Sequence, residues 1–139
     1  MNDDHGWVTL WILGLCLMVL SLGGLAIDLW RAITERRELA AMADAAAIAG
    51  SSGVDTMAWR ESGEVLLDAD LAIERANVAL AAQPGAAELA GAPVVIIDGD
   101  SITVELSKVV PFTLLRLVAG AADPFVVRVS ATSRAALGP

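Results

Sequence analysis

An uncharged run at residues 7–27 constrains the fold most, because 11 of its 21 residues are Leu, Ile or Val. As a helix rising about 1.5 Å per residue, the run would span about 31 Å, which matches a hydrocarbon core of about 30 Å. Each Leu, Ile or Val favours insertion by roughly 0.3 to 0.6 kcal/mol, so together they favour it by about 5 kcal/mol. We therefore predict a transmembrane helix over residues 7–27.

Tryptophans flank this run, with Trp7 and Trp11 at its start and Trp30 just beyond its end. Indole rings settle at membrane–water interfaces, so we predict that these side chains are interface anchors. The alternative, a cleaved signal peptide, has a basic start and an apolar core of about 7 to 15 residues. Here residues 1–6 form an acidic tail and the run is too long, which favours a helix kept in the mature protein.

The composition excludes several classes of function. The net charge is −8 and the nine basic residues are scattered, so the chain lacks the positive patch that nucleic acid requires. Its single cysteine, Cys16, lies inside the apolar run, and its single histidine, His5, lies in the tail. These counts exclude a disulfide within the chain, a His-based catalytic triad and a Cys/His metal site. We expect no cofactor, no metal and no catalytic residue.

Two remaining features could carry chemistry. Lys108 is the only lysine, and a Ser/Lys nucleophile pair would need it; we predict instead a solvated charge on the polar face of a strand. Asp98 and Asp100 flank Gly99. Two carboxylates fall short of the six or more oxygens that calcium takes, so we interpret them as turn residues. The chain is therefore predicted not to be an enzyme.

Good helix formers continue over residues 28–50, where Arg31 and Glu35 lie one turn apart. We predict that the membrane helix extends into solvent as one helix and ends at Gly50. Seven of the thirteen residues at 38–50 are alanine. Such small side chains permit close approach of another helix or of a sheet, so this stretch is predicted to be a packing face.

Residues 51–139 are predicted to form a small α+β domain. Asp55 is expected to cap a short helix around Trp59, and Asp68 a helix at about 69–83. The buried stripe of that longer helix is predicted to comprise Ile73, Ala76 and Leu80.

The pattern changes to alternation in the last third of the chain, which predicts strands at about 93–98, 101–109 and 124–133. Asp98 and Gly99 are typical of a two-residue hairpin turn. A short helix or turn is predicted at residues 112–119. The expected fold class is α+β, with a long N-terminal helix and a three-stranded antiparallel sheet whose apolar face packs on the alanine-rich helix.

A glycine before the apolar run, an aspartate and an arginine after it, and an Asp-Ala-Ala-Ala-x-Ala-Gly motif at residues 44–50 resemble the TadE/TadG-like family of Flp/Tad pilus assembly. The resemblance covers residues 4–53. It implies a membrane-anchored, pilin-like component at the bacterial envelope, with other Tad pilus or secretion-machine proteins as partners and homo- or hetero-oligomers through the N-terminal helix. The residues implied in the motif and in helix packing are Gly6, Asp28, Arg31, Asp44, Ala45, Ala46, Ala49 and Gly50.

Three alternatives stay open. The family implies an extracytoplasmic domain, whereas a positive-inside count of Arg31, Arg36 and Arg37 points to the cytoplasm. Cleavage between Gly6 and Trp7 is also left open. Pilin-like precursors are cut after a glycine and carry Glu five residues further on, whereas here the fifth residue after Gly6 is Trp11. The competing function is a membrane-tethered adaptor or regulatory module that binds a protein partner.

Overall fold

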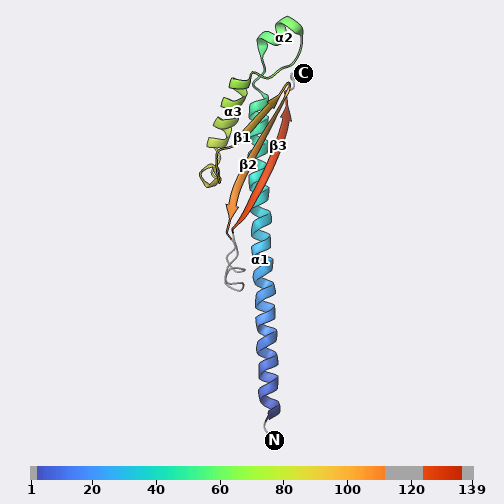
Figure 1. Cartoon of the computed structure of the whole chain (residues 1–139), viewed down its shortest axis with the longest axis vertical. Coiled ribbons are helices and arrows are strands. Elements are labelled where there is room, and N and C mark those ends of the chain that lie inside the picture. Colours follow the sequence, from blue (N-terminus) through green and yellow to red (C-terminus); the bar gives the residue numbers. More distant parts are fainter. Residues whose placement is uncertain (1–2, 112–123, 136–139) are drawn as a thin grey trace. The chain divides into compact units, whose positions relative to one another are not determined.

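The structure is a computed structural model that describes residues 3–111 and 124–135, the first three of them in backbone only. In chain order the elements are α1 (Asp3–Ser51), α2 (Thr56–Ser62), α3 (Ala69–Ala81), the 3-10 turn η1 (Ala86–Glu88), β1 (Val94–Asp98), β2 (Ser101–Val110) and β3 (Phe125–Arg134) (Figure 1). The predicted α+β fold, with a long apolar N-terminal helix and a three-stranded sheet, is confirmed. The helix or turn predicted at 112–119 lies outside the described residues.

The chain divides into two compact units. Unit 1 comprises Met1–Thr34 and Pro111–Phe125, and unit 2 comprises Glu35–Val110 and Val126–Pro139. The first part of α1 belongs to unit 1 and its last part to unit 2. The alanine-rich stretch of α1 is therefore part of the folded unit that holds the sheet.

The core of unit 2 is formed by the end of α1, by α3 and by the sheet, which lies along this part of α1 (Figure 1). Small side chains let these layers approach closely: Ala43 and Ala46 of α1 and Ala72 and Ala76 of α3 are fully buried. From the sheet, Ile102, Val104 and Leu106 of β2 complete the core.

The prediction for the buried stripe of α3 is wrong at Ile73, which is 37% exposed. Ala72 is buried in its place, together with Ala76 and Leu80. These three residues are spaced by four and so share one helix face, whereas the side chain of residue 73 points about 100° away. The core takes the smallest side chain of this turn, because α3 lies close to α1.

Both predicted helix caps are confirmed. The Asp55 carboxylate accepts hydrogen bonds from the backbone amides of Met57 and Ala58 at 2.8 and 3.1 Å and starts α2. The Asp68 carboxylate accepts one from the amide of Leu71 at 3.1 Å and starts α3. Each cap satisfies amides that the first helical turn leaves without a partner.

The sheet has the order β1-β2-β3, with β2 in the centre. β1 pairs antiparallel with β2 from Val94 opposite Glu105 to Asp98 opposite Ser101. The two loop residues are Gly99 and Asp100, one position later than predicted. Gly99 has φ 59°, and a glycine with positive φ at the first loop position fits a type II′ hairpin turn.

Candidate membrane and helix-packing surfaces

The first part of α1 carries its apolar side chains outward. All 11 Leu, Ile and Val residues at 7–27 are between 47% and 70% exposed. By length and composition, α1 is the one helix of the described chain that could cross a membrane, with a mean hydropathy of 2.4 in its most apolar stretch of 18 residues. Contact with water is unfavourable for an apolar surface of this size, so α1 fits a lipid environment or contact with other apolar helices.

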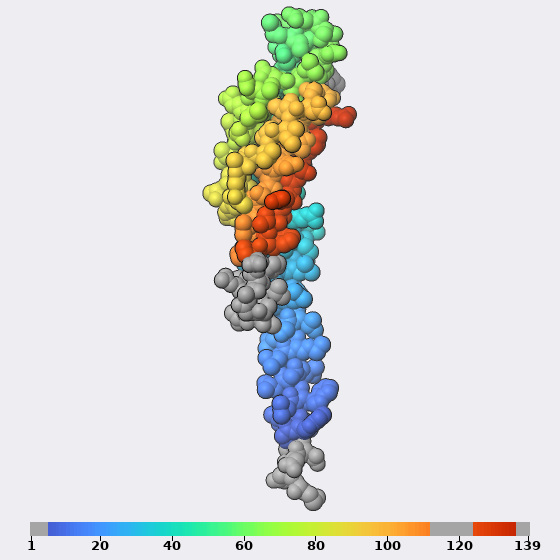
Figure 2. Space-filling model, in the orientation of Figure 1, coloured from blue at the N-terminus to red at the C-terminus, as the bar shows by residue number. Residues whose placement is uncertain are grey.

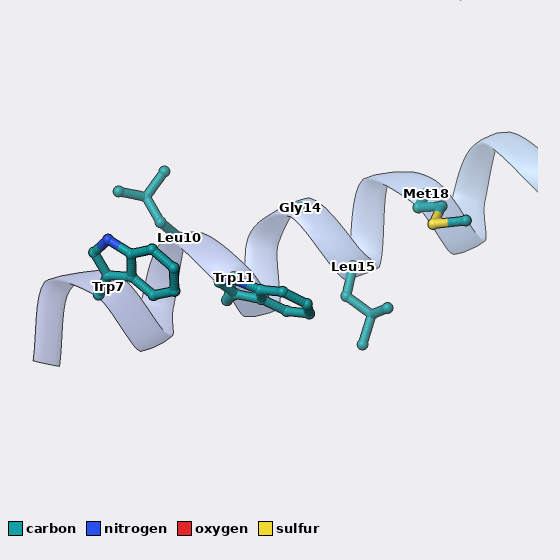
Figure 3. A pocket seen from close by; sticks show the side chains of 6 residues that line it. All are labelled: Trp7, Leu10, Trp11, Gly14, Leu15 and Met18. Carbon is teal, nitrogen blue, oxygen red and sulfur yellow. The ribbon is translucent and has the colours of Figure 1, made fainter. Parts of the chain in front are cut away.

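The three predicted interface anchors are exposed on α1: Trp7 by 69%, Trp11 by 65% and Trp30 by 73%. Figure 3 shows Trp7 and Trp11 on successive turns, beside a hollow that Leu10, Gly14, Leu15 and Met18 also line. All these residues come from one helix. Ligand pockets are enclosed on several sides, so this hollow is surface relief on a helix and not a small-molecule site.

The structure places the residues of the family motif on several faces of α1. The two of them that lie deepest in unit 2, Ala46 and Gly50, are one turn apart and face α3 and the sheet. Asp28, which belongs to unit 1, is only 3% exposed. Of the other motif residues, Gly6, Arg31 and Asp44 are exposed, and Ala45 and Ala49 are half-buried.

Gly50 and Gly53 occupy positions where a side chain would meet the rest of unit 2. A Cβ atom at Gly50 would lie 2.4 Å from Cδ1 of Ile102 and 3.1 Å from the carbonyl oxygen of Ala72. A Cβ atom at Gly53 would lie 2.8 Å from the amide nitrogen and 3.0 Å from Cα of Ala72. The glycine that ends the motif therefore has a packing role, since it lets α3 approach the end of α1.

Lys108 forms ion pairs that were not predicted from the sequence. Its Nζ lies 2.5 Å from Oε2 of Glu35 on α1 and 2.5 Å from Oε2 of Glu88 in η1, and its side chain is only 14% exposed. The predicted solvated charge is therefore wrong. Lys108 shares the alternation of Val104 and Leu106, which places it on the buried face of β2, and a charge on that face needs a partner.

The electrostatics of this cluster keep Lys108 protonated. The hydrogen bonds to Glu35 and then to Glu88 raise the pKa of Lys108 above its usual value, against the effect of burial. The hydrogen bond and charge of Lys108 lower the pKa of Glu88. A lysine whose pKa is raised does not give up its proton near neutral pH, so Lys108 is poorly suited to act as the base of a Ser/Lys pair.

Replacing Lys108 with methionine is expected to destabilise unit 2 by about 1 kcal/mol through loss of the hydrogen bond to Glu35. Because folding raises the pKa of Lys108, the contribution of Lys108 to the stability of unit 2 is complete below its unfolded-state pKa of about 10.4. This contribution is lost as the pH rises through the folded-state pKa. Because folding lowers the pKa of Glu88, the contribution of Glu88 to stability is complete above its unfolded-state pKa of about 4.3 and is lost as the pH falls.

The measurement is thermal unfolding of the full chain in detergent micelles between pH 3 and 11. The difference between wild type and Lys108→Met should be constant from about pH 5 to 10 and shrink outside that window. If the difference in stability between wild type and Lys108→Met were the same at every pH, the ion pairs of Lys108 would not be its cause.

Among residues 3–111 and 124–135, no three His, Cys, Asp or Glu side chains come together as a metal site would require. In the described chain, the candidate functional surfaces are therefore the exposed apolar surface of the first part of α1 and the alanine-rich face of α1 that packs inside unit 2.

Comparison with known proteins agrees with this arrangement. Residues 6–60 match the family described as Flp pilus-assembly TadE/G-like. Searches of curated proteins and of solved structures gave no match. The matched residues include both surfaces of α1 as well as Gly53 and most of α2, and the family is one of assembly rather than catalysis. Over residues 6–60, this chain is therefore similar to the TadE/G-like family of Flp pilus assembly.

Proposed function

We propose that the chain is a non-enzymatic, pilin-like component of Tad/Flp pilus assembly, anchored in the bacterial cytoplasmic membrane through residues 7–27. The observation that carries the proposal is the exposed apolar surface of α1, which lies inside the segment matched to the family. Lipid covers this surface before assembly. Other Tad pilus or secretion-machine proteins, or further copies of the chain, contact the same helix during assembly.

The division of α1 supports separate tasks for its two parts. The part at residues 7–27 is apolar on all sides, as a helix in contact with lipid or with other apolar helices must be. The part from Glu35 onward has one buried face and is held by α3 and the sheet. The membrane part thus serves anchoring and assembly, and unit 2 is the domain that the anchor presents.

In this proposal unit 2 lies on the extracytoplasmic side, where a pilus is assembled. Arg31, Arg36 and Arg37 follow the span and favour the opposite orientation by the positive-inside rule. The family match supports the extracytoplasmic placement. A non-enzymatic role is supported by the ion pairs of Lys108, which hold its proton.

The proposal is tested in the native host by deleting the gene and examining the cells by negative-stain electron microscopy. Surface pili are expected to be lost and to return with the wild-type gene. Protease added to spheroplasts expressing the chain with a C-terminal epitope is expected to remove the epitope. An epitope that is fully protected until the membrane is broken, or unchanged piliation after deletion, would defeat the proposal.

A further inference from the structure

We infer that the sheet of unit 2 pairs edge to edge with the sheet of a second copy of this chain, β3 of one copy beside β1 of the next, with Arg134 of the first next to Asp98 of the second. The inference rests on the proposed membrane anchoring, which gives neighbouring copies one common direction.

Both edges of the sheet are open to such pairing. β1 and β3 are the edge strands. Among residues 3–111 and 124–135, Val94–Asp98 and residues 126–134 have no backbone hydrogen bonds other than those of the sheet itself. Figure 2 shows the three strands side by side on the surface of unit 2. An open edge with unpaired amides and carbonyls is a template for another strand.

The side chains of the two edges complement each other in charge. β1 has one charged residue, Asp98, whereas β3 has two, Arg128 and Arg134. In the described chain neither Asp98 nor Arg134 forms an ion pair. One edge is therefore acidic, and the other is basic.

The register brings these charges to the same level of the sheet. The hydroxyl oxygens of Thr103 and Thr132 lie 2.8 Å apart, which places Thr132 across from Thr103 on the outer face. Two residues on, Arg134 is then level with Ser101, and Ser101 pairs with Asp98. If a second copy is placed by moving it along the hydrogen-bonding direction of the sheet, without sliding it along the strands, Arg134 of one copy lies beside Asp98 of the next.

The second copy placed in this way also covers exposed apolar side chains of β1. Val94 and Ile96 are 51% and 50% exposed on β1. In the paired sheet, Ile96 of one copy lies beside Thr132 of its neighbour, because both are level with Thr103. β-branched and threonine side chains pack well across neighbouring strands.

Pairing of two β3 edges is disfavoured. An antiparallel β3–β3 pair centred on Ala131 sets Arg128 opposite Arg134, and like charges opposite each other are destabilising. Such a pair would also reverse one copy, whereas membrane insertion gives α1 one direction in every copy. β1 pairs antiparallel with β2, and Figure 1 shows β3 running opposite to β2, so β3 beside β1 keeps that direction. Because the two edges differ, the contact repeats from copy to copy in an open row.

The test uses the full chain with Cys16→Ala, reconstituted into vesicles of phosphatidylethanolamine and phosphatidylglycerol. Ile96→Cys and Thr132→Cys are added, and the vesicles are oxidised with copper phenanthroline. A ladder of crosslinked species above the dimer is expected from the double-cysteine chain. The matched controls carry one cysteine each; mixed together they should give heterodimers only, and each alone should give none.

Charge reversal then tests the proposed pair within the same double-cysteine chain. Asp98→Arg alone and Arg134→Asp alone are each expected to reduce crosslinking several-fold, and the combined variant is expected to restore it. Equal crosslinking in all four chains would overturn the pairing. A chain that floats with the vesicles but forms no ladder also overturns it and leaves the anchoring in place. A chain that does not float contradicts the anchoring, and the common direction required by the pairing falls with it.

Discussion

A chain in which Leu15 and Val19 are both replaced with arginine is expected to leave the membrane fraction. Each arginine near the centre of a span costs roughly 2.5 to 3.5 kcal/mol and also removes roughly 0.3 to 0.6 kcal/mol of favourable transfer, so the pair opposes insertion by about 6 to 8 kcal/mol. That exceeds the favourable transfer of about 5 kcal/mol from all the Leu, Ile and Val residues of the span. The measurement is the share of chain that remains in the pellet after alkaline carbonate extraction.

The matched control carries the same two added charges on α1 outside the span. Ile33 and Ile48 are 43% and 64% exposed, so Ile33→Arg with Ile48→Arg buries no charge in the hydrocarbon core. This control is expected to stay in the pellet like the wild type. If the Leu15→Arg, Val19→Arg chain also stays there, residues 7–27 do not form the membrane anchor.

Local patterns explain why the architecture is predictable from the sequence. Residues 7–49 contain no proline, so nothing interrupts α1 before its end. Asp55 and Asp68 each cap the helical turn that directly follows them. Gly99, which lies between the two paired strands, has the positive φ that the hairpin turn requires. Each of these features depends on neighbours in the chain, and the sequence displays neighbours directly.

Features set by distant residues are harder to predict. Glu35 and Lys108 are 73 residues apart, and no local pattern brings a helix of unit 2 over the end of β2. The alternation of β2 nevertheless contained a signal, because Lys108 follows Leu106 on the apolar face. Similarly, Ile73 is the larger apolar residue, yet the close approach of α3 to α1 selects Ala72 for the core.

Replacing Gly53 with alanine is expected to destabilise unit 2 by about 1 to 3 kcal/mol, and by more than Gly50→Ala does. The new methyl group at Gly53 would meet backbone atoms of Ala72 at 2.8 and 3.0 Å, which move only if α3 moves. At Gly50 the nearest atom is the end of the Ile102 side chain, which can rotate. Alanine is also a better helix former than glycine by about 1 kcal/mol, which offsets part of the strain within α1.

Hydrogen exchange of the full chain in micelles, followed by mass spectrometry of α3 peptides, measures this effect. Gly53→Ala should speed exchange of α3 amides, whereas the control Gly91→Ala should not, because a Cβ there meets no atom within 4 Å. Equal protection in both variants would show that α3 has room to shift. Faster exchange in Gly53→Ala alone would mean that α3 packs closely against the alanine-rich face of α1 because Gly53 leaves room for the backbone of Ala72.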